Sequence, residues 1–152
     1  MSRFRTPIHL ETVIGATLKE RPFIVLSDIV YITDELPTEN VICVKTGFRT
    51  DFATIPRFLW RVVGAPSGWY REGAIIHDWL CPKTTASGVV APFMCDHITA
   101  SNIFYEAMID IIDNSGWSAF KKAHRRRQAT IMRWAVAKFG PQFEADSWGG
   151  GS

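Results

Sequence analysis

Two short segments gather the residue types that could do chemistry, and the first is an adjacent histidine and aspartate. His77 and Asp78 interrupt an otherwise apolar run. Imidazole and carboxylate groups are the usual ligands of hydrolytic metal sites, where the ion activates water or polarises a carbonyl or phosphoryl oxygen. Neighbouring side chains on a helix point about 100° apart, so both reach one ion only if it lies near the helix surface. The alternative is a histidine at the edge of the core that pairs with a carboxylate.

The second segment is 47–57, where Asp51 lies between Phe48 and Phe52. A carboxylate among aromatic rings is expected to be partly desolvated and to need an arginine, backbone N–H groups or a metal ion as a partner. Aspartate is also common in turns, where it accepts hydrogen bonds from nearby backbone amides and has no further role. Asp51 is therefore either a ligand or a turn residue.

These segments together describe a possible hydrolytic site for zinc or manganese. Further ligands would come from the neighbouring pair Asp96 and His97, and Arg57 would stabilise negative charge that develops in the reaction. The candidate catalytic residues are Arg57 and Asp78, and the candidate metal ligands are Asp51, His77, Asp78, Asp96 and His97.

A run of basic residues is the one strong charge cluster of the chain. Such a run can bind phosphates or another anionic partner, but it is more typical of the solvated face of a helix. The net charge of +2 does not make nucleic acid the expected partner. The candidate anion-binding residues are Lys121, Lys122, Arg125, Arg126 and Arg127.

Three aromatic residues surround a Gly-Ala-Pro-Ser-Gly loop at 64–68. Trp60 precedes the loop, and Trp69 and Tyr70 follow it. We expect these three side chains to be exposed and to offer an interface to a protein partner.

The elements that must position these groups follow a simple order, with strands first and helices later. Runs of β-branched and aromatic residues predict strands at 12–18, 23–26, 29–33 and 41–45, joined as an antiparallel meander. Helical patterns follow at 54–62, 70–80, 103–112 and 118–139. This order favours an α+β fold, with three to four helices packed against a small antiparallel sheet.

The last two helical patterns also predict which sides face the core. Apolar residues form one broad stripe along 103–112. In the helix at 118–139, Phe120, Ile131, Trp134 and Ala135 lie on one side, which we expect to pack inside.

Length and composition limit the class of protein. A chain of 152 residues with 47% hydrophobic residues fits a single domain, predicted at 1–146, followed by a flexible Gly-rich tail at 147–152. Three cysteines without a C-x-x-C pair make a disulfide framework improbable. No apolar run approaches the roughly 20 residues that span a bilayer, so we expect synthesis in the cytosol. Motifs of P-loop, dinucleotide-binding, α/β-hydrolase and zincin proteins are absent from the sequence.

The two segments, taken together, resemble a family of small proteins of unknown function encoded by tailed bacteriophages and prophages. The likeness spans roughly residues 28 to 140 and rests on the stretches 47–57, 74–80, 103–108 and 135–140. It implies a phage origin and places Asp51, Arg57, His77 and Asp78 on motif positions. This chain has Ser101 where the family pattern has an aspartate, so Asp96 would have to substitute or the site is lost.

Two classes of function follow. The first is a metal-dependent hydrolase, for which amide bonds of the host cell wall are a natural phage substrate. The second is a non-catalytic component of the virion, in the tail or baseplate, or a protein that binds a host factor, with the same polar residues forming an internal network. Synthesis would occur in the host cytoplasm, and the expected partners are other phage structural proteins or a host protein.

Overall fold

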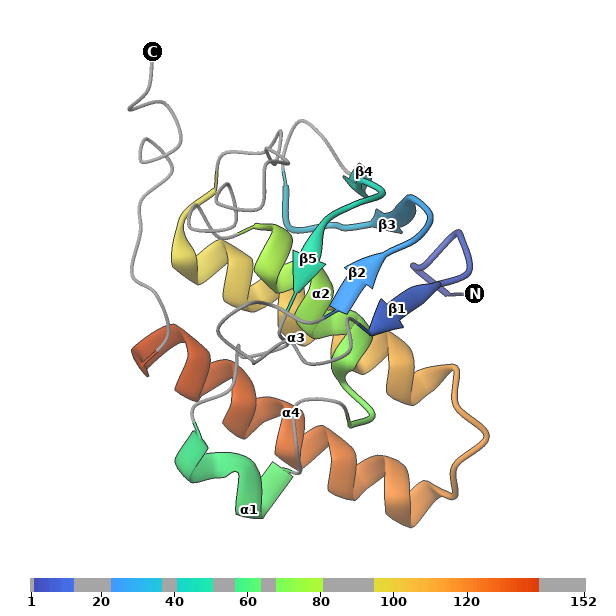
Figure 1. The fold of residues 1–152 in the computed structure, drawn as a ribbon. Coiled ribbons are helices and arrows are strands. Elements are labelled where there is room, and N and C mark those ends of the chain that lie inside the picture. The colour runs from blue at the N-terminus through green and yellow to red at the C-terminus, as the bar shows by residue number, and fades with distance from the viewer. Residues whose placement is uncertain are drawn as a thin grey trace.

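The computed structural model describes residues 2–12, 23–36, 41–50, 57–63, 68–80 and 95–139, and it confirms the α+β class (Figure 1). The strands are β1 (Leu10–Thr12), β2 (Phe23–Val25), β3 (Ile29–Ile32), β4 (Val41–Val44) and β5 (Arg49–Thr50). The helices are the 3-10 turn η2 (Arg57–Leu59), then α1 (Trp60–Val63), α2 (Arg71–Trp79), α3 (His97–Asp113) and α4 (Ala119–Phe139).

The strands form two antiparallel sheets instead of the predicted meander. One sheet has the order β1-β2-β5 and the other pairs β3 with β4. The sequence patterns missed β5 because it is only two residues long. The turn between β4 and β5 contains Gly47, whose positive φ of 92° suits glycine. After this turn β5 pairs with β2, with Phe23 opposite Thr50. This register brings the end of β5 over the helical layer.

Helix α2 is the central element, since it lies between the strands and α3 (Figure 1). Every residue from Gly73 to Trp79 is buried, which is typical of a helix surrounded by protein. Helices α2 and α3 approach closely at Gly73, where an added Cβ would lie 3.3 Å from the ring of Phe104. Glycine at this position therefore lets the two helices pack close together.

Helix α3 buries the apolar stripe that its sequence predicts. Its N-cap is Asp96, whose carboxylate accepts a hydrogen bond of 2.7 Å from the backbone N–H of Thr99. The buried apolar residues of this helix are Ala100, Ile103, Phe104, Ala107, Met108 and Ile112.

Helix α4 buries a different side from the one that the sequence predicts. Phe120, Ile131 and Trp134 are exposed, and among the four residues expected inside only Ala135 is buried. The buried side carries mostly smaller or flexible residues, which let α4 pack closely on α3. These residues are Gln128, Ala129, Met132, Ala135 and Val136. The largest apolar side chains of α4 consequently lie on the surface.

None of the helices that the structure describes is long and apolar enough to cross a membrane. The predicted tail at 147–152 and most of the predicted strand at 12–18 lie outside the described residues.

Candidate functional site

His77 lies deep in the molecule, on the side of α2 that faces α3. It is only 2% exposed, and its ring centroid lies 5.7 Å from that of Phe104. Burial lowers the pKa of this imidazole to about 4, because the charged form would lose its hydration. His77 is therefore neutral near pH 7.

Asp78 contacts a different element, because its side chain reaches the end of β5. Its Oδ2 accepts a hydrogen bond of 2.5 Å from the hydroxyl of Thr50, and both residues are buried. A hydrogen bond to a buried carboxylate replaces part of the hydration that the charge has lost. The bond joins residues 28 positions apart and ties the sheet to α2.

The two neighbouring motif residues thus contact different elements. The ring of His77 lies against α3, and the carboxylate of Asp78 is bonded to β5. This divergence follows from the roughly 100° between successive side chains on a helix. Through these contacts the two residues link α2 to α3 and to β5.

The remaining motif residues are only partly described. Asp51 lies outside the described residues, although it directly follows Thr50 in the sequence. Arg57 begins η2, but its side chain also lies outside what is described.

Asp96 and His97 lie at the start of α3, where Asp96 is the N-cap and His97 is the first residue of the helix. The backbone N–H of Thr99 lowers the pKa of the Asp96 carboxyl, as expected for an N-cap residue. Ser101 is buried, and its hydroxyl donates to the backbone oxygen of His97 at 2.8 Å. Among the described residues, no three histidine, cysteine, aspartate or glutamate side chains are grouped so that they could hold a metal ion.

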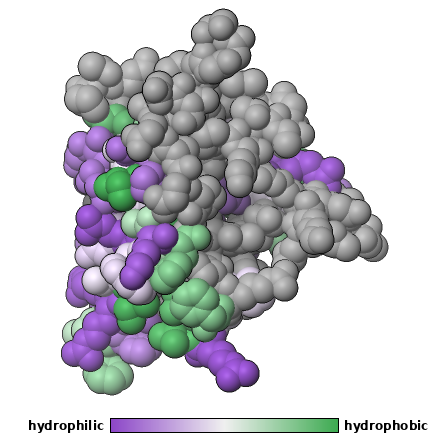
Figure 2. All heavy atoms as spheres, turned by 90° about the vertical axis from the view of Figure 1, so that its left-hand side faces the viewer, coloured by the Kyte–Doolittle hydropathy of each residue, from purple (hydrophilic) through white to green (hydrophobic). Residues whose placement is uncertain are grey.

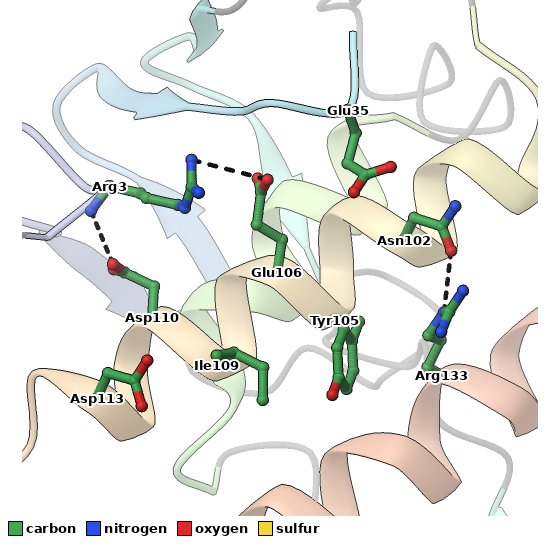
Figure 3. Close-up of a pocket in the computed structure, with 9 residues that line it drawn as sticks. All are labelled: Arg3, Glu35, Asn102, Tyr105, Glu106, Ile109, Asp110, Asp113 and Arg133. Atoms are coloured by element: carbon green, nitrogen blue, oxygen red, sulfur yellow. Dashed lines mark hydrogen bonds and ion pairs between the residues drawn. The ribbon is translucent and has the colours of Figure 1, made fainter.

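A cavity of about 440 Å³ lies away from these motifs, beside α3 (Figure 3). The hydroxyl of Tyr31 donates to Glu106 at 2.9 Å, and the Arg3 guanidinium lies 3.7 Å from the same carboxylate. Asp110 accepts hydrogen bonds from the Ser2 hydroxyl and from the Arg3 backbone N–H. The cavity is lined by Arg3, Glu35, Asn102, Tyr105, Glu106, Ile109, Asp110, Asp113 and Arg133.

This cavity was not predicted from the sequence. Its signal was the polar side of α3, where Asn102, Glu106, Asp110 and Asp113 recur at helical spacing opposite the apolar stripe. The carboxylates of Glu106 and Asp110 already hold the N-terminal segment against α3.

Most of the basic run on α4 is engaged in contacts within the protein. The Arg125 guanidinium lies 5.5 Å from the ring centroid of Trp69 and 5.7 Å from that of Trp117. Arg126 forms a 2.8 Å ion pair with Asp113. The ammonium group of Lys121 lies 4.6 Å from the ring centroid of Trp117, and Lys122 donates to the backbone oxygen of Asp113. These contacts fix the start of α4 and favour a structural role over binding of nucleic acid.

The expected aromatic interface is not exposed as predicted. Tyr70 is fully buried, because it lies in the core at the start of α2, and burial raises the pKa of its hydroxyl to about 12. Trp60 and Trp69 are partly buried and pack against the core. The exposed large apolar side chains near this region belong to η2, α1 and α4, and include Phe58, Val62, Ile131, Trp134 and Phe139.

Comparisons with known proteins give a family without an assigned activity. Residues 23–136 match the family described as "Protein of unknown function (DUF1353)". A relative, "Uncharacterized protein y4jT" of Sinorhizobium fredii (strain NBRC 101917 / NGR234), is 30% identical over 105 residues, which are 68% of this chain and 25% of the relative. The chain thus spans about a quarter of the length of this relative. No solved structure matches the chain. Because the family match covers most of its length, the chain belongs to the DUF1353 family of proteins of unknown function.

Proposed function

We propose that this domain works by binding another protein and that the His77 and Asp78 motif is a structural joint. The observation that carries the proposal is the divergence of the two side chains. Asp78 accepts a hydrogen bond from Thr50 of β5, while His77 lies against Phe104 of α3. The joint would hold β5, α2 and α3 in place.

The energetics support a structural role. Burying a carboxylate costs several kcal/mol unless hydrogen bonds replace its hydration. A neighbouring element that supplies such a hydrogen bond is therefore held in place by it. A buried neutral histidine in contact with an aromatic ring contributes to packing without carrying charge. Neither group then needs contact with solvent or substrate.

The biological setting that we propose is a tailed bacteriophage or prophage. The proposal rests on the likeness of segments 47–57 and 74–80 to the motifs of small phage proteins. In this setting the domain is a minor component of the tail or baseplate, or an early protein that binds a host factor in the cytoplasm.

Mass spectrometry of purified virions tests the setting. Peptides of this chain at a constant ratio to known tail proteins are the expected result for a virion component. Their absence from particles, with the protein detected in infected cells, would leave the host-factor role. Absence from both would contradict the proposal.

A metal-dependent hydrolase of cell-wall amide bonds is the second candidate, and one observation favours it. Thr50, which directly precedes Asp51, bonds Asp78, and the candidate requires the Asp51 and Asp78 carboxylates to share a zinc or manganese ion with His77. Arg57 would then stabilise the developing negative charge.

Thermal unfolding with and without zinc, manganese and magnesium separates the two candidates. The binding role predicts an unchanged melting temperature and no amide cleavage in muropeptides. The hydrolase predicts a rise of the melting temperature that an Asp78→Asn variant loses, together with metal-dependent cleavage. Asp34→Asn is the control in both assays, because Asp34 is an exposed carboxylate that pairs with Arg3 and is not among the candidate ligands.

A further inference from the structure

The exposed side of α4 carries a regular stripe of large and cationic side chains. Successive members are spaced by four and three residues, which places them on one side of a helix over roughly 27 Å. We call these residues the α4 stripe: Phe120, His124, Arg127, Ile131, Trp134 and Lys138. All six are exposed, and Phe120 and Trp134 are 87% and 54% exposed.

Helix α1 and the turn η2 extend this surface. The rings of Phe58 and Phe139 are in edge contact at 5.6 Å, and the Gln128 side chain donates to the backbone oxygen of Val62 at 2.7 Å. These contacts place η2 and α1 along α4, with Phe58 and Val62 exposed. Figure 2 looks onto the side where α1 and the C-terminal end of α4 lie in Figure 1, and hydrophobic and hydrophilic side chains are interleaved there.

The charged residues of η2, α1 and α4 themselves have one sign. Helix α4 carries lysine and arginine, η2 and α1 each carry one arginine, and none of these three elements contains aspartate or glutamate. On the stripe itself, the Lys138 ammonium group lies 5.1 Å from the ring centroid of Trp134, and Arg127 precedes Ile131 by one turn. Cations beside exposed aromatic rings suit an apolar partner surface that is bordered by carboxylates.

We propose that the α4 stripe, with Phe58 and Val62, docks an acidic amphipathic helix of a partner protein. The alternating spacing of four and three residues is that of helices that pack against each other, so the fitting occupant is a helix. A second copy docked through the same face would bring Arg127 and Lys138 against cations, which disfavours self-association through this surface. This inference rests on the binding role proposed above and names the class of partner.

The test uses a synthetic helix of roughly 20 residues, with leucine at the a and d heptad positions and glutamate at the flanking positions. Binding to the full chain is measured by fluorescence anisotropy of the labelled peptide. Three further probes are the same peptide with lysine for glutamate, vesicles of phosphatidylglycerol, and a DNA duplex of about 20 base pairs. We expect binding of the acidic helix only, weakening as salt concentration rises.

Variants locate the binding surface. Trp134→Ala is expected to weaken binding by roughly tenfold or more, because exposed tryptophans are frequent hot spots of interfaces. Arg127→Glu is expected to weaken binding of the acidic helix and to reduce its salt dependence. Leu26→Ala is the matched control, since Leu26 is an exposed apolar residue beside β2 (48%) and should leave binding unchanged.

Failure to bind the acidic helix, equal loss of binding in the Leu26→Ala control, or tighter binding of vesicles or DNA would overturn the proposed partner class. None of these outcomes bears on the joint at His77 and Asp78, which the metal and unfolding experiments test separately. Conversely, metal-dependent cleavage by the protein would refute the non-catalytic role and leave the peptide result standing.

Discussion

Helices α2 and α4 use their polar and apolar residues in opposite ways. In α2 the titratable residues His77 and Asp78 are buried and contact neighbouring elements. In α4 large apolar residues such as Ile131 and Trp134 are exposed, and smaller ones such as Ala129 pack inside. The residues with the most obvious chemistry are therefore buried, while residues typical of a core are exposed.

This contrast changes where a function should be sought. A His-Asp pair is a typical motif of a site, but in this protein both side chains are buried in contacts with α3 and β5. An exposed patch of aromatic residues often marks an interaction surface, and aromatic residues and arginine are enriched in interfaces.

The largest effect is expected from a matched pair of tryptophans. Trp79→Ala should lower the free energy of unfolding by about 3–5 kcal/mol, because Trp79 is fully buried and its ring packs on Phe48 at 5.1 Å. Trp134→Ala should cost less than about 1 kcal/mol, since that side chain is exposed. Urea unfolding checks both. Similar losses for the two variants would contradict the assigned burial.

The next effect concerns pH. The folded pKa of His77 is about 4, below the ordinary 6.5, so the unfolded chain binds more protons between these values. The stability contributed by neutral His77 is present in full above pH 6.5 and is lost as the pH falls toward 4, by roughly 3 kcal/mol. A His77→Gln variant should lack this part of the acid dependence in unfolding measurements. Identical pH profiles would show that His77 is not buried as described.

A smaller effect is expected from the hydrogen bond that ties β5 to α2. In a double-mutant cycle of Thr50→Val and Asp78→Ala, the coupling energy should be about 1.5–3 kcal/mol, as for a hydrogen bond to a buried charge. Chemical denaturation of the four proteins gives the value. If the losses of unfolding free energy in the two single variants simply add up in the double variant, the two side chains are not coupled and the joint is refuted.

The smallest effects separate two neighbouring arginines of α4. Arg125→Ala should cost about 1–2 kcal/mol, because Arg125 lies beside two indole rings and donates to Gln128 at 2.7 Å. Arg126→Ala should cost below about 1 kcal/mol, since its ion pair with Asp113 is largely exposed. Thermal unfolding at low and high salt compares them. A reversed ranking would mean that Arg126 is the structural cation.

The sequence predicted those parts of the fold that depend on local pattern. Helices α2 and α4 begin and end within about one residue of their predicted bounds, because each has a clear stop signal, whereas α3 begins six residues before its predicted apolar stripe, at position 97 instead of 103. Strand β5 was missed because it is two residues long and exists only through pairing with β2. The cavity beside α3 was missed because Arg3 reaches it from the N-terminal segment, a contact with no local signal.

The buried side of α4 was mispredicted for a different reason. Phe120, Ile131 and Trp134 look like core residues by type, and hydrophobicity alone cannot tell a core stripe from a docking stripe. Gln128 is buried although glutamine is usually exposed. Its burial is possible because its side chain accepts a hydrogen bond from Arg125 and donates one to the backbone oxygen of Val62. For the candidate site, the sequence identified the polar residues but could not give the directions in which they point.

The most direct test of the central claim is NMR of the His77 ring, followed from neutral pH to below pH 4, with and without zinc. The account predicts a ring that stays neutral until about pH 4 and ring resonances that zinc does not shift. Titration near the ordinary value of 6.5, or a stoichiometric shift of the ring resonances on addition of zinc, would contradict the structural joint and favour a metal site.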